Sequence, residues 1–452
     1  MSDRRVAVWT IASTIVSALL QLLLMMVAAR HMGLASFGLL AVINTISAVL
    51  LTFQEMGLSS YCIYIGEQSH RQHATLFWVS AGLAGIFALI LLIVSPLIAF
   101  FFRMEALSSY IYVLSANFIL VGFSAQFQAN FIRVMRADMV AKAELLARVF
   151  SFGLAVSLMV LGTDGVVAIV VGMTVFSLVK LLVMALFSEP QWRPSLAFDR
   201  AVAKQALRYG GYQGGSQLVN QLRSRIDIVL IGRLLGPEMV GLYSMAKDLL
   251  EYPLRVFQPL MGRLLLPRLA RLRDKPELLH VYYFRGLTFT AFGALVVYGL
   301  MILLGPWVVE ILYGRSFSEV ATLLPAFLVY ATLRPLGINA GLLAQATGQT
   351  GREFSWNLLS ICLMAAGMAL TALLASSVSG FAIGLSVIQL LVSVLVFPLF
   401  VQYFLPVSLR AYIQAWIGAA VAALALALLA SQIYLPPLHS LIDWGGVAGV
   451  VK

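Results

Sequence analysis

Long apolar segments separated by short polar loops recur along the whole chain. Each segment holds roughly 18 or more mostly apolar residues, enough for an α-helix to cross a hydrocarbon core of about 30 Å. The pattern predicts thirteen membrane-spanning helices, near residues 6–30, 36–60, 74–101, 107–132, 140–162, 164–187, 205–233, 238–262, 286–312, 320–346, 353–376, 380–404 and 411–434. A last apolar stretch, 440–452, would extend only about 20 Å as a helix, so it predicts an incomplete span or a re-entrant end.

A short motif repeats at a constant offset of 203 residues. Residues 30–39 read RHMGLASFGL and residues 233–242 read RLLGPEMVGL, so the Arg, both glycines and the final Leu coincide. Because the offset contains six predicted helices, an even number, both copies have the same orientation in the membrane. We therefore expect two six-helix bundles related as parallel repeats. They are predicted at 1–187 and 205–404, with a cytoplasmic linker at 188–204 and one or two additional helices in 405–452.

The composition excludes a soluble globular protein. Of the 452 residues, 61% are hydrophobic and 11% are charged, and the mean hydropathy is +0.95. A soluble domain has about 25% charged residues. The first apolar segment has no small-residue cleavage site after it, so we expect it to be retained as a helix. These features predict an all-α polytopic membrane protein.

Positive charges are concentrated at the N-terminus and in every second loop. The other loops hold Lys or Arg only at Arg30, Arg103, Arg233 and Arg315. Because Lys and Arg accumulate on the cytoplasmic side of a membrane, the N-terminus is predicted to be cytoplasmic. The net charge of +11 is then explained by topology and by attraction to anionic lipid headgroups. No basic soluble module indicates nucleic-acid binding.

Basic residues also occur inside the predicted spans, where a charge costs a few kcal/mol unless it faces a cavity or a partner. These intramembrane cations are Arg148, Lys180, Arg223, Arg225, Lys247, Arg255 and Arg334. Arg334 lies near the middle of its span, without an acidic residue within one turn and directly before Pro335, which breaks a helix. We expect Arg334 to face a hydrated cavity.

Two neighbouring spans carry polar stripes. Lys247, Glu251 and Arg255 are spaced by four residues and share one helix face, with Asp248 beside them. The preceding span has a similar stripe, which consists of Gln213, Gln217, Asn220, Arg223 and Asp227, while Arg225 lies off it. Both spans are therefore predicted to line a hydrated surface.

The alternative for each charge is a purely structural ion pair. Lys247 can pair with Glu251, and Glu251 with Arg255, along one helix. Glu144 and Arg148 have the same four-residue spacing, and we expect them to pair. Lys180 is expected to extend its ammonium group toward the cytoplasmic interface. The five His residues and two Cys residues have no metal-ligand spacing, so no metal site or cofactor is expected.

Three stretches carry a resemblance to a known family. They are IDIVLIGRLLGPEMVGLYSMAKDLLEYPLRVFQPLMGRLLLPRLARL at 226–272, RPLGINAGLLAQATGQTGREFSWN at 334–357, and AARHMGLASFGLLAVINTISAVLL at 28–51. The chain resembles the bacterial polysaccharide exporters of the colanic-acid type, within the superfamily of multidrug, oligosaccharidyl-lipid and polysaccharide transporters. The resemblance implies a V-shaped pair of six-helix bundles around a central cavity, followed by two additional helices.

It also implies a function and a location. Such proteins move an undecaprenyl-diphosphate-linked oligosaccharide from the inner to the outer leaflet of the bacterial cytoplasmic membrane, by alternating access between the two halves. Other partners implied are the membrane lipids and the polysaccharide polymerase and glycosyltransferases of the same pathway. No nucleic acid is implied.

The intramembrane polar residues fit this cargo. A diphosphate needs cationic partners when it leaves water, and the candidates are Arg334, Arg223, Arg225, Lys247 and Arg255. The candidates for sugar contacts are Gln213, Gln217 and Asn220, and those for coupling to H⁺ or Na⁺ are Asp227, Asp248 and Glu251.

Three other functions are open at this point. A cation-coupled multidrug antiporter of the same superfamily would share the fold, but a cavity with net positive side chains favours an anionic cargo. A membrane glycosyltransferase, polymerase or ligase needs catalytic groups on a sizeable extramembrane loop, and the loops opposite the basic side are short and lack a DxD pair. A structural scaffold does not explain the buried cations.

Overall fold

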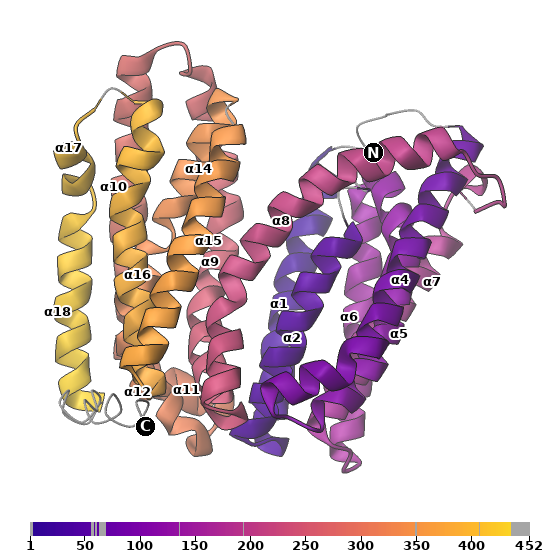
Figure 1. Cartoon of the computed structure of the whole chain (residues 1–452), viewed down its shortest axis with the longest axis horizontal. Coiled ribbons are helices and arrows are strands. Elements are labelled where there is room, and N and C mark those ends of the chain that lie inside the picture. Colours follow the sequence, from indigo (N-terminus) through magenta and orange to yellow (C-terminus); the bar gives the residue numbers. More distant parts are fainter. Residues whose placement is uncertain are drawn as a thin grey trace, which may run out of the picture. The chain divides into compact units, whose positions relative to one another are not determined.

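The computed structural model describes residues 3–55, 58, 61–62, 69–134, 136–192, 194–348, 350–405 and 407–434 (Figure 1). These residues form helices and their connections, without a β-strand. They divide into two compact units, Met1–Gln221 and Leu222–Lys452. The boundary falls inside one long helix, α8, and thus later in the chain than the predicted linker at 188–204. The central cavity expected between the halves stays a prediction.

The first unit contains six long helices before α8. They are α1 (Asp3–His31), α2 (Leu34–Glu55), α4 (His70–Phe102), α5 (Leu107–Arg133), α6 (Ala137–Val160) and α7 (Gly165–Leu186). A short 3-10 turn at Pro190–Trp192 follows, and α8 extends over Arg200–Leu234. The first six helices match the first six predicted spans in order and approximate length.

The second unit contains the remaining helices. They are α9 (Pro237–Arg271), α10 (Pro276–Leu303), α11 (Gly305–Tyr313), α12 (Ser318–Leu323), α13 (Leu328–Leu333), α14 (Leu336–Thr347), α15 (Thr350–Leu374), α16 (Val378–Leu399), α17 (Leu409–Gln414) and α18 (Ile417–Tyr434). Short 3-10 turns lie at Arg315–Phe317, Leu324–Phe327 and Val401–Tyr403. The predicted partial span at 440–452 lies outside the described residues.

Ten helical segments in the described part of the chain are long and apolar enough to cross a membrane. The chain is thus an all-helical, multi-pass membrane protein. The other three predicted spans, 205–233, 238–262 and 411–434, fall on α8, α9 and α18, where part of the side chains lie outside the described residues. As membrane spans they stay predictions.

Proline changes two of the predicted helix boundaries. The expected span 286–312 is divided into α10 and α11, because Pro306 in the first turn of α11 has no N–H to continue the preceding helix. The expected span 320–346 is likewise divided at Pro325 and Pro335 into three helices and a 3-10 turn. The second break places Arg334 between two helices.

The repeated motif forms the same turn in each unit. Helices α1 and α2 meet at Gly33, and α8 and α9 meet at Gly236. The N–H of Phe37 donates to the Gly33 carbonyl at 3.2 Å, and the N–H of Val240 donates to the Gly236 carbonyl at 3.2 Å. Gly236 has φ +85°, a left-handed conformation that residues with a Cβ rarely adopt. Each copy of the motif therefore forms a glycine turn between two consecutive helices.

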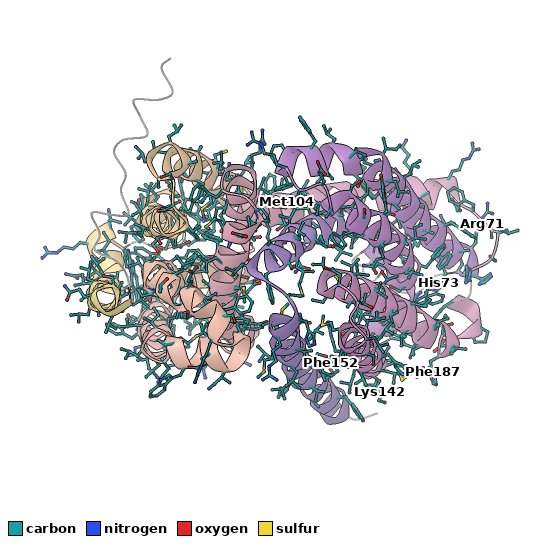
Figure 2. All side chains as sticks on the ribbon, turned by 90° about the horizontal axis from the view of Figure 1, so that it is seen from below. Arg71, His73, Met104, Lys142, Phe152 and Phe187 are labelled. Atoms are coloured by element: carbon teal, nitrogen blue, oxygen red, sulfur yellow. The ribbon has the colours of Figure 1, made fainter. Side chains whose placement is uncertain are left out.

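The segment after α7 is packed onto the first unit. Trp192 is 2% exposed, and its ring lies edge-on to Phe131 at 5.3 Å. Arg71, which lies at the start of α4 and is labelled in Figure 2, donates a hydrogen bond to the Phe198 carbonyl at 3.0 Å. The Trp78 indole donates to the Ser195 carbonyl at 2.7 Å. The predicted linker is therefore packed against the first unit near the start of α4 and is not a free tether.

Replacing Trp192 by alanine is expected to lower the free energy of unfolding by about 3 kcal/mol, because the indole fills a closed aromatic cluster. Thermal unfolding of the purified protein in detergent measures this loss. Trp78→Phe is the matched control, since Trp78 is an exposed indole and should cost much less. Equal unfolding temperatures for Trp192→Ala and the parent would contradict the packing role.

Candidate functional site

A small polar pocket lies inside the second unit. Its lining comes from α8, α9, the α13–α14 junction, α15 and α16, and consists of Ser224, Ile226, Asp227, Lys247, Tyr330, Arg334, Met364 and Leu385. Three of these side chains carry charge. Charged groups in an apolar bundle mark a functional site unless each is neutralised in place.

Asp227 and Lys247 form a buried ion pair across the α8–α9 turn. The Lys247 Nζ lies 2.5 Å from Asp227 Oδ2, and the two side chains are 6% and 3% exposed, respectively. The same ammonium group donates to the Ser224 carbonyl at 3.1 Å. Lys247 is therefore neutralised and held by α8.

The Asp227 carboxylate has further donors. The Tyr243 hydroxyl donates to Oδ2 at 2.7 Å, and the Ile228 N–H donates to Oδ1 at 3.0 Å. With Lys247, three groups donate to this carboxylate. Buried charges are stable only when they are paired and hydrogen-bonded in this way.

Local geometry explains why these residues meet. The tight turn at Gly236 folds α9 back along α8, so residues at similar distances on either side of the turn lie level with each other. Asp227 precedes Gly236 by two and a half turns, and Tyr243 and Lys247 follow it by two and three turns. Tyr243 and Lys247 are four residues apart, so both face α8.

Arg334 is positioned by the break between α13 and α14. Its N–H donates to the Tyr330 carbonyl at 2.8 Å and ends α13, while Pro335 cannot continue the helix. The half-buried side chain lines the pocket and lies in the electrostatic field of Tyr330, Glu251 and Asp227. Within the described part of the chain, Arg334 forms no ion pair with a carboxylate, so its charge is not neutralised by direct contact.

The structure brings together some of the predicted site residues. Arg334, Lys247 and Asp227 share the pocket. Glu251 is half-buried and close enough to interact electrostatically with both Lys247 and Arg334. Lys247 pairs with Asp227 on α8, and not with Glu251 one turn along α9 as the sequence suggested.

Other predicted residues lie elsewhere or outside the description. Asp248 interacts electrostatically with Tyr313 of α11 and does not line the pocket. Arg225 is half-buried and is likewise not part of the lining. The side chains that lie outside the described part of the structure are those of Arg223, Arg255, Gln213, Gln217 and Asn220.

Three polar residues at the site were not predicted, namely Ser224, Tyr243 and Tyr330. Tyr243 continues the four-residue spacing of Lys247 and Glu251 toward the start of α9, and Tyr330 precedes Arg334 by the same spacing. Extending each charged stripe by one turn would have found both tyrosines. Ser224 contributes a backbone carbonyl, for which a sequence offers no signal.

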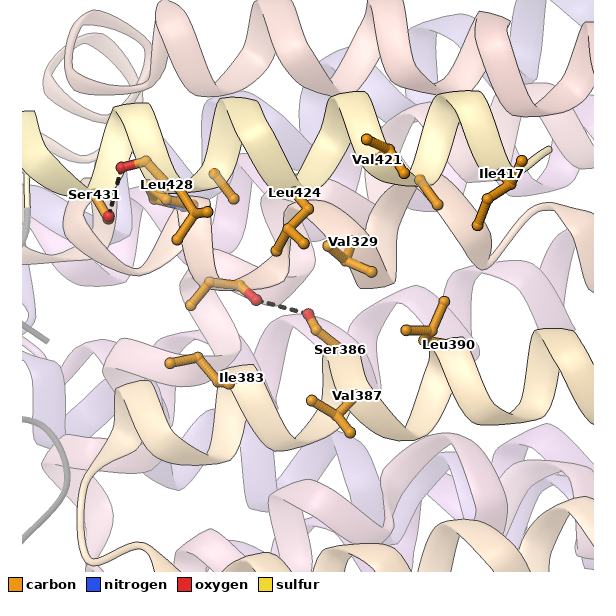
Figure 3. A pocket seen from close by; sticks show the side chains of 14 residues that line it. Val329, Ile383, Ser386, Val387, Leu390, Ile417, Val421, Leu424, Leu428 and Ser431 are labelled. Atoms are coloured by element: carbon orange, nitrogen blue, oxygen red, sulfur yellow. Dashed lines mark hydrogen bonds between the residues drawn. The ribbon is translucent and has the colours of Figure 1, made fainter.

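A larger pocket in the second unit, of about 300 Å³, has a different chemistry. Figure 3 shows its walls, which include Val329 of α13, Val387 of α16, and Val421 and Leu424 of α18. The Ser386 hydroxyl donates to the Ala326 carbonyl at 2.6 Å and is satisfied there. Without a charged side chain in its lining, this pocket does not suit an anion. No group of three or more His, Cys, Asp or Glu side chains in the described segments can hold a metal ion.

The fold is that of a known class of membrane proteins. The chain superposes on the lipid II flippase MurJ, in an inward closed conformation, with a TM-score of 0.72 over 94% of this chain and 98% of that one, at 11% identity. This likeness shows the fold, which is that of a multi-pass, all-helical membrane protein.

The particular family follows from the sequence comparisons. The model of the polysaccharide biosynthesis protein family matches residues 27–322, so the chain belongs to this family. It is 32% identical over 303 residues to the amylovoran biosynthesis protein AmsL of Erwinia amylovora, which covers 67% of this chain and 78% of that protein. It is 26% identical over 388 residues to the lipopolysaccharide biosynthesis protein WzxC of Escherichia coli, with 85% and 78% covered.

Proposed function

We propose that this protein carries an undecaprenyl-diphosphate-linked oligosaccharide from the inner to the outer leaflet of the cytoplasmic membrane, for the synthesis of a cell-surface polysaccharide. Membership of the polysaccharide biosynthesis family supports this assignment, as do relatives named for amylovoran and lipopolysaccharide biosynthesis. The observation that carries it is Arg334, an intramembrane cation that faces a polar pocket and has no ion-pair partner in the described part of the chain.

The chemistry of the cargo explains the need for such a residue. A diphosphate that leaves water loses its hydration, and a guanidinium replaces part of it through two parallel charge-assisted hydrogen bonds. Lys247 is already neutralised by Asp227, so its role is to hold α8 and α9 together beside Arg334. We assign Arg223, Arg225 and Arg255 as further contacts for the diphosphate, and Gln213, Gln217 and Asn220 as contacts for the sugars.

Orientation and partners follow from the same proposal. The excess of basic residues at the N-terminus and in alternate loops supports a cytoplasmic N-terminus in a bacterial inner membrane. The sugar lipid is then received from glycosyltransferases on the cytoplasmic side and delivered to a polymerase on the opposite side. The two units would alternate access to the cargo.

Coupling to H⁺ or Na⁺ is assigned to Glu251. Three donors already occupy the Asp227 carboxylate, and Asp248 does not line the pocket. Glu251 is half-buried and lies in the electrostatic field of Lys247 and Arg334, so a change in its charge would be felt by the residues that line the pocket.

Glu251→Gln is expected to abolish the dependence of transport on an imposed H⁺ or Na⁺ gradient, because the amide cannot exchange a charge. Uptake of the sugar lipid into proteoliposomes, measured with and without each gradient, tests this. Asp248→Asn is the matched control, three positions earlier on α9, and should keep the dependence. An unchanged gradient dependence in Glu251→Gln would return Glu251 to a structural role.

The alternative function, a cation-coupled multidrug antiporter, is not favoured. The family match is to polysaccharide biosynthesis, and Arg334 in the pocket would repel an organic cation.

The proposed function is tested with proteoliposomes that contain the purified protein and an undecaprenyl-diphosphate oligosaccharide in one leaflet. A sugar-binding probe outside the vesicles measures how fast the oligosaccharide reaches the opposite leaflet. We expect protein-dependent movement that is faster than in empty liposomes. Movement of organic cations but of no sugar lipid would instead indicate an antiporter.

A further inference from the structure

A second group of intramembrane charges lies inside the first unit, between α1, α6 and α7. The Lys180 Nζ donates to Glu144 Oε1 at 2.8 Å. Arg148 donates through Nη1 to Oε1 of Gln21, on α1, at 3.2 Å. The sequence suggested instead that Glu144 pairs with Arg148 and that Lys180 points to the interface, and both expectations are wrong.

Close packing of α6 and α7 explains this arrangement. The Ser151 hydroxyl donates to the Gly172 carbonyl at 2.7 Å, and a Cβ on Gly172 would lie 3.2 Å from the Ala155 Cβ. Small residues permit such approach in membrane helices. About one turn further, the two antiparallel helices place Arg148 beside Phe176, and one turn beyond that Glu144 beside Lys180.

The aromatic ring of Phe176 lies between the two cations. The Arg148 guanidinium carbon is 4.6 Å from the ring centroid, and the Lys180 Nζ is 6.0 Å from it. Both distances are within the range of cation–π attraction. The ring therefore covers one face of the guanidinium, so a further ligand would bind through the in-plane N–H groups.

Arg148 is the excess charge of this group. Glu144 is paired with Lys180 and interacts with Arg148 only through its field. Among the described residues, Arg148 makes no ion pair, and its Nε is buried without a hydrogen-bond partner. Arg148 follows the first residue of α6 by eleven positions, which places it about 16 Å along the helix and near the middle of a core of about 30 Å.

The vacant hydrogen-bond capacity of Arg148 matches one kind of ligand. An Arg side chain presents Nε and one terminal nitrogen as a pair of parallel donors, which fits two oxygens of a phosphate group. Nη1 of Arg148 is hydrogen-bonded to Gln21, and one face of the guanidinium packs on Phe176. These two contacts fix the orientation of the edge that carries Nε. A charge at this depth costs several kcal/mol. Binding of an anion to Arg148 would offset that cost.

The approach from the start of α1 and α6 is also polar. Lys142, labelled in Figure 2, has its Nζ 5.2 Å from the centroid of the Trp9 ring and pairs with Asp138 at 3.0 Å. On α1, Thr14, Ser17 and Gln21 share one face because of their spacing.

We propose that the first unit contains a second anion-binding site, formed by Arg148, Lys180 and Gln21, that binds a phosphate group of the lipid-linked cargo. This inference rests on the proposed function for the identity of the cargo. The site is separate from the pocket at Arg334, and it gives each unit its own contact for the charged headgroup.

The site is tested by binding and not by transport. Native mass spectrometry of the full-length protein measures the affinity for undecaprenyl diphosphate and for phosphatidylglycerol, in an Arg334→Ala background that removes the other contact. Arg148→Gln is expected to weaken binding of undecaprenyl diphosphate at least about tenfold. Lys142→Gln, which removes a cation already paired with Asp138, should leave this affinity within about twofold.

Stability separates a binding role from a structural one. Arg148→Met replaces an unneutralised buried charge by an apolar side chain of similar length, so we expect the unfolding temperature to stay the same or to rise while binding is lost. A lower unfolding temperature with binding intact would make Arg148 a structural residue. Unchanged binding in both Arg148 variants would overturn the site.

The identity of the ligand is decided by the two lipids. If Arg148→Gln weakens both lipids equally, the site holds bulk anionic phospholipid and the assignment to the cargo is wrong. The proposed function fails independently: wild-type protein that binds undecaprenyl diphosphate through Arg148 but moves no sugar lipid would retain the site and refute the flippase.

Discussion

Arg334→Ala is expected to lower the rate of sugar-lipid transport by about tenfold to a hundredfold, without loss of folded protein from the membrane. The guanidinium lines the polar pocket and forms no ion pair with a described carboxylate. It is therefore available for a diphosphate, and charge-assisted hydrogen bonds to such a group are worth about 1.5–3 kcal/mol. Removing them from the carrier slows the step in which the headgroup enters the bilayer.

The transport rate is measured in proteoliposomes with a sugar-binding probe. Two further variants serve as controls. Arg334→Lys keeps the charge but loses the pair of parallel donors, so it should retain part of the rate. Arg315→Ala removes an exposed cation that pairs with Glu310 and should transport normally. A normal rate for Arg334→Ala would remove the anion-binding pocket from the mechanism.

Hydropathy and the internal repeat predicted most of the fold. The first six helices and the two glycine turns follow from patterns that are local in the chain, namely apolar length and the spacing of Arg and Gly. Errors arose at Pro306 and Pro325, inside segments of uniform hydropathy. There the loss of one backbone donor divides a helix without changing its apolar character.

The sequence predicted where the intramembrane charges lie better than it predicted which charges pair. Intramembrane positions of Arg334, Lys247 and Asp227 identified the pocket, because a charge in an apolar span needs an explanation. Their partners depend on how helices face each other, and this information is not local. Lys247 pairs with Asp227 and not with Glu251, and Glu144 pairs with Lys180 and not with Arg148. In both cases the partner lies on a neighbouring helix.

The two units have the same pattern of ion pairing. In each unit one Lys neutralises one carboxylate across two helices, and one Arg is left without a described ion-pair partner. In these two clusters the carboxylates of Asp227 and Glu144 are occupied by lysines, whereas the two guanidinium groups have no described ion-pair partner. The arrangement favours an anionic cargo in both units.

The Asp227–Lys247 pair is expected to behave as a structural lock. Asp227→Ala or Lys247→Ala alone should lower the free energy of unfolding by about 3–5 kcal/mol, because each leaves a buried charge without its partner. The double variant Asp227→Asn/Lys247→Met should recover most of this loss, since no unpaired charge remains. Thermal unfolding of the purified variants measures the three effects.

Transport by the double variant then decides between two roles for Asp227. If the pair only joins α8 to α9, the double variant should move the sugar lipid with the same gradient dependence as the parent, at a rate within about threefold, because Arg334 and Glu251 are untouched. If Asp227 instead exchanged a coupling ion, restored stability would be accompanied by loss of the gradient dependence. The three hydrogen-bond donors on the Asp227 carboxylate favour the first result, since an exchangeable ion would have to displace an ammonium group that α8 also holds through Ser224.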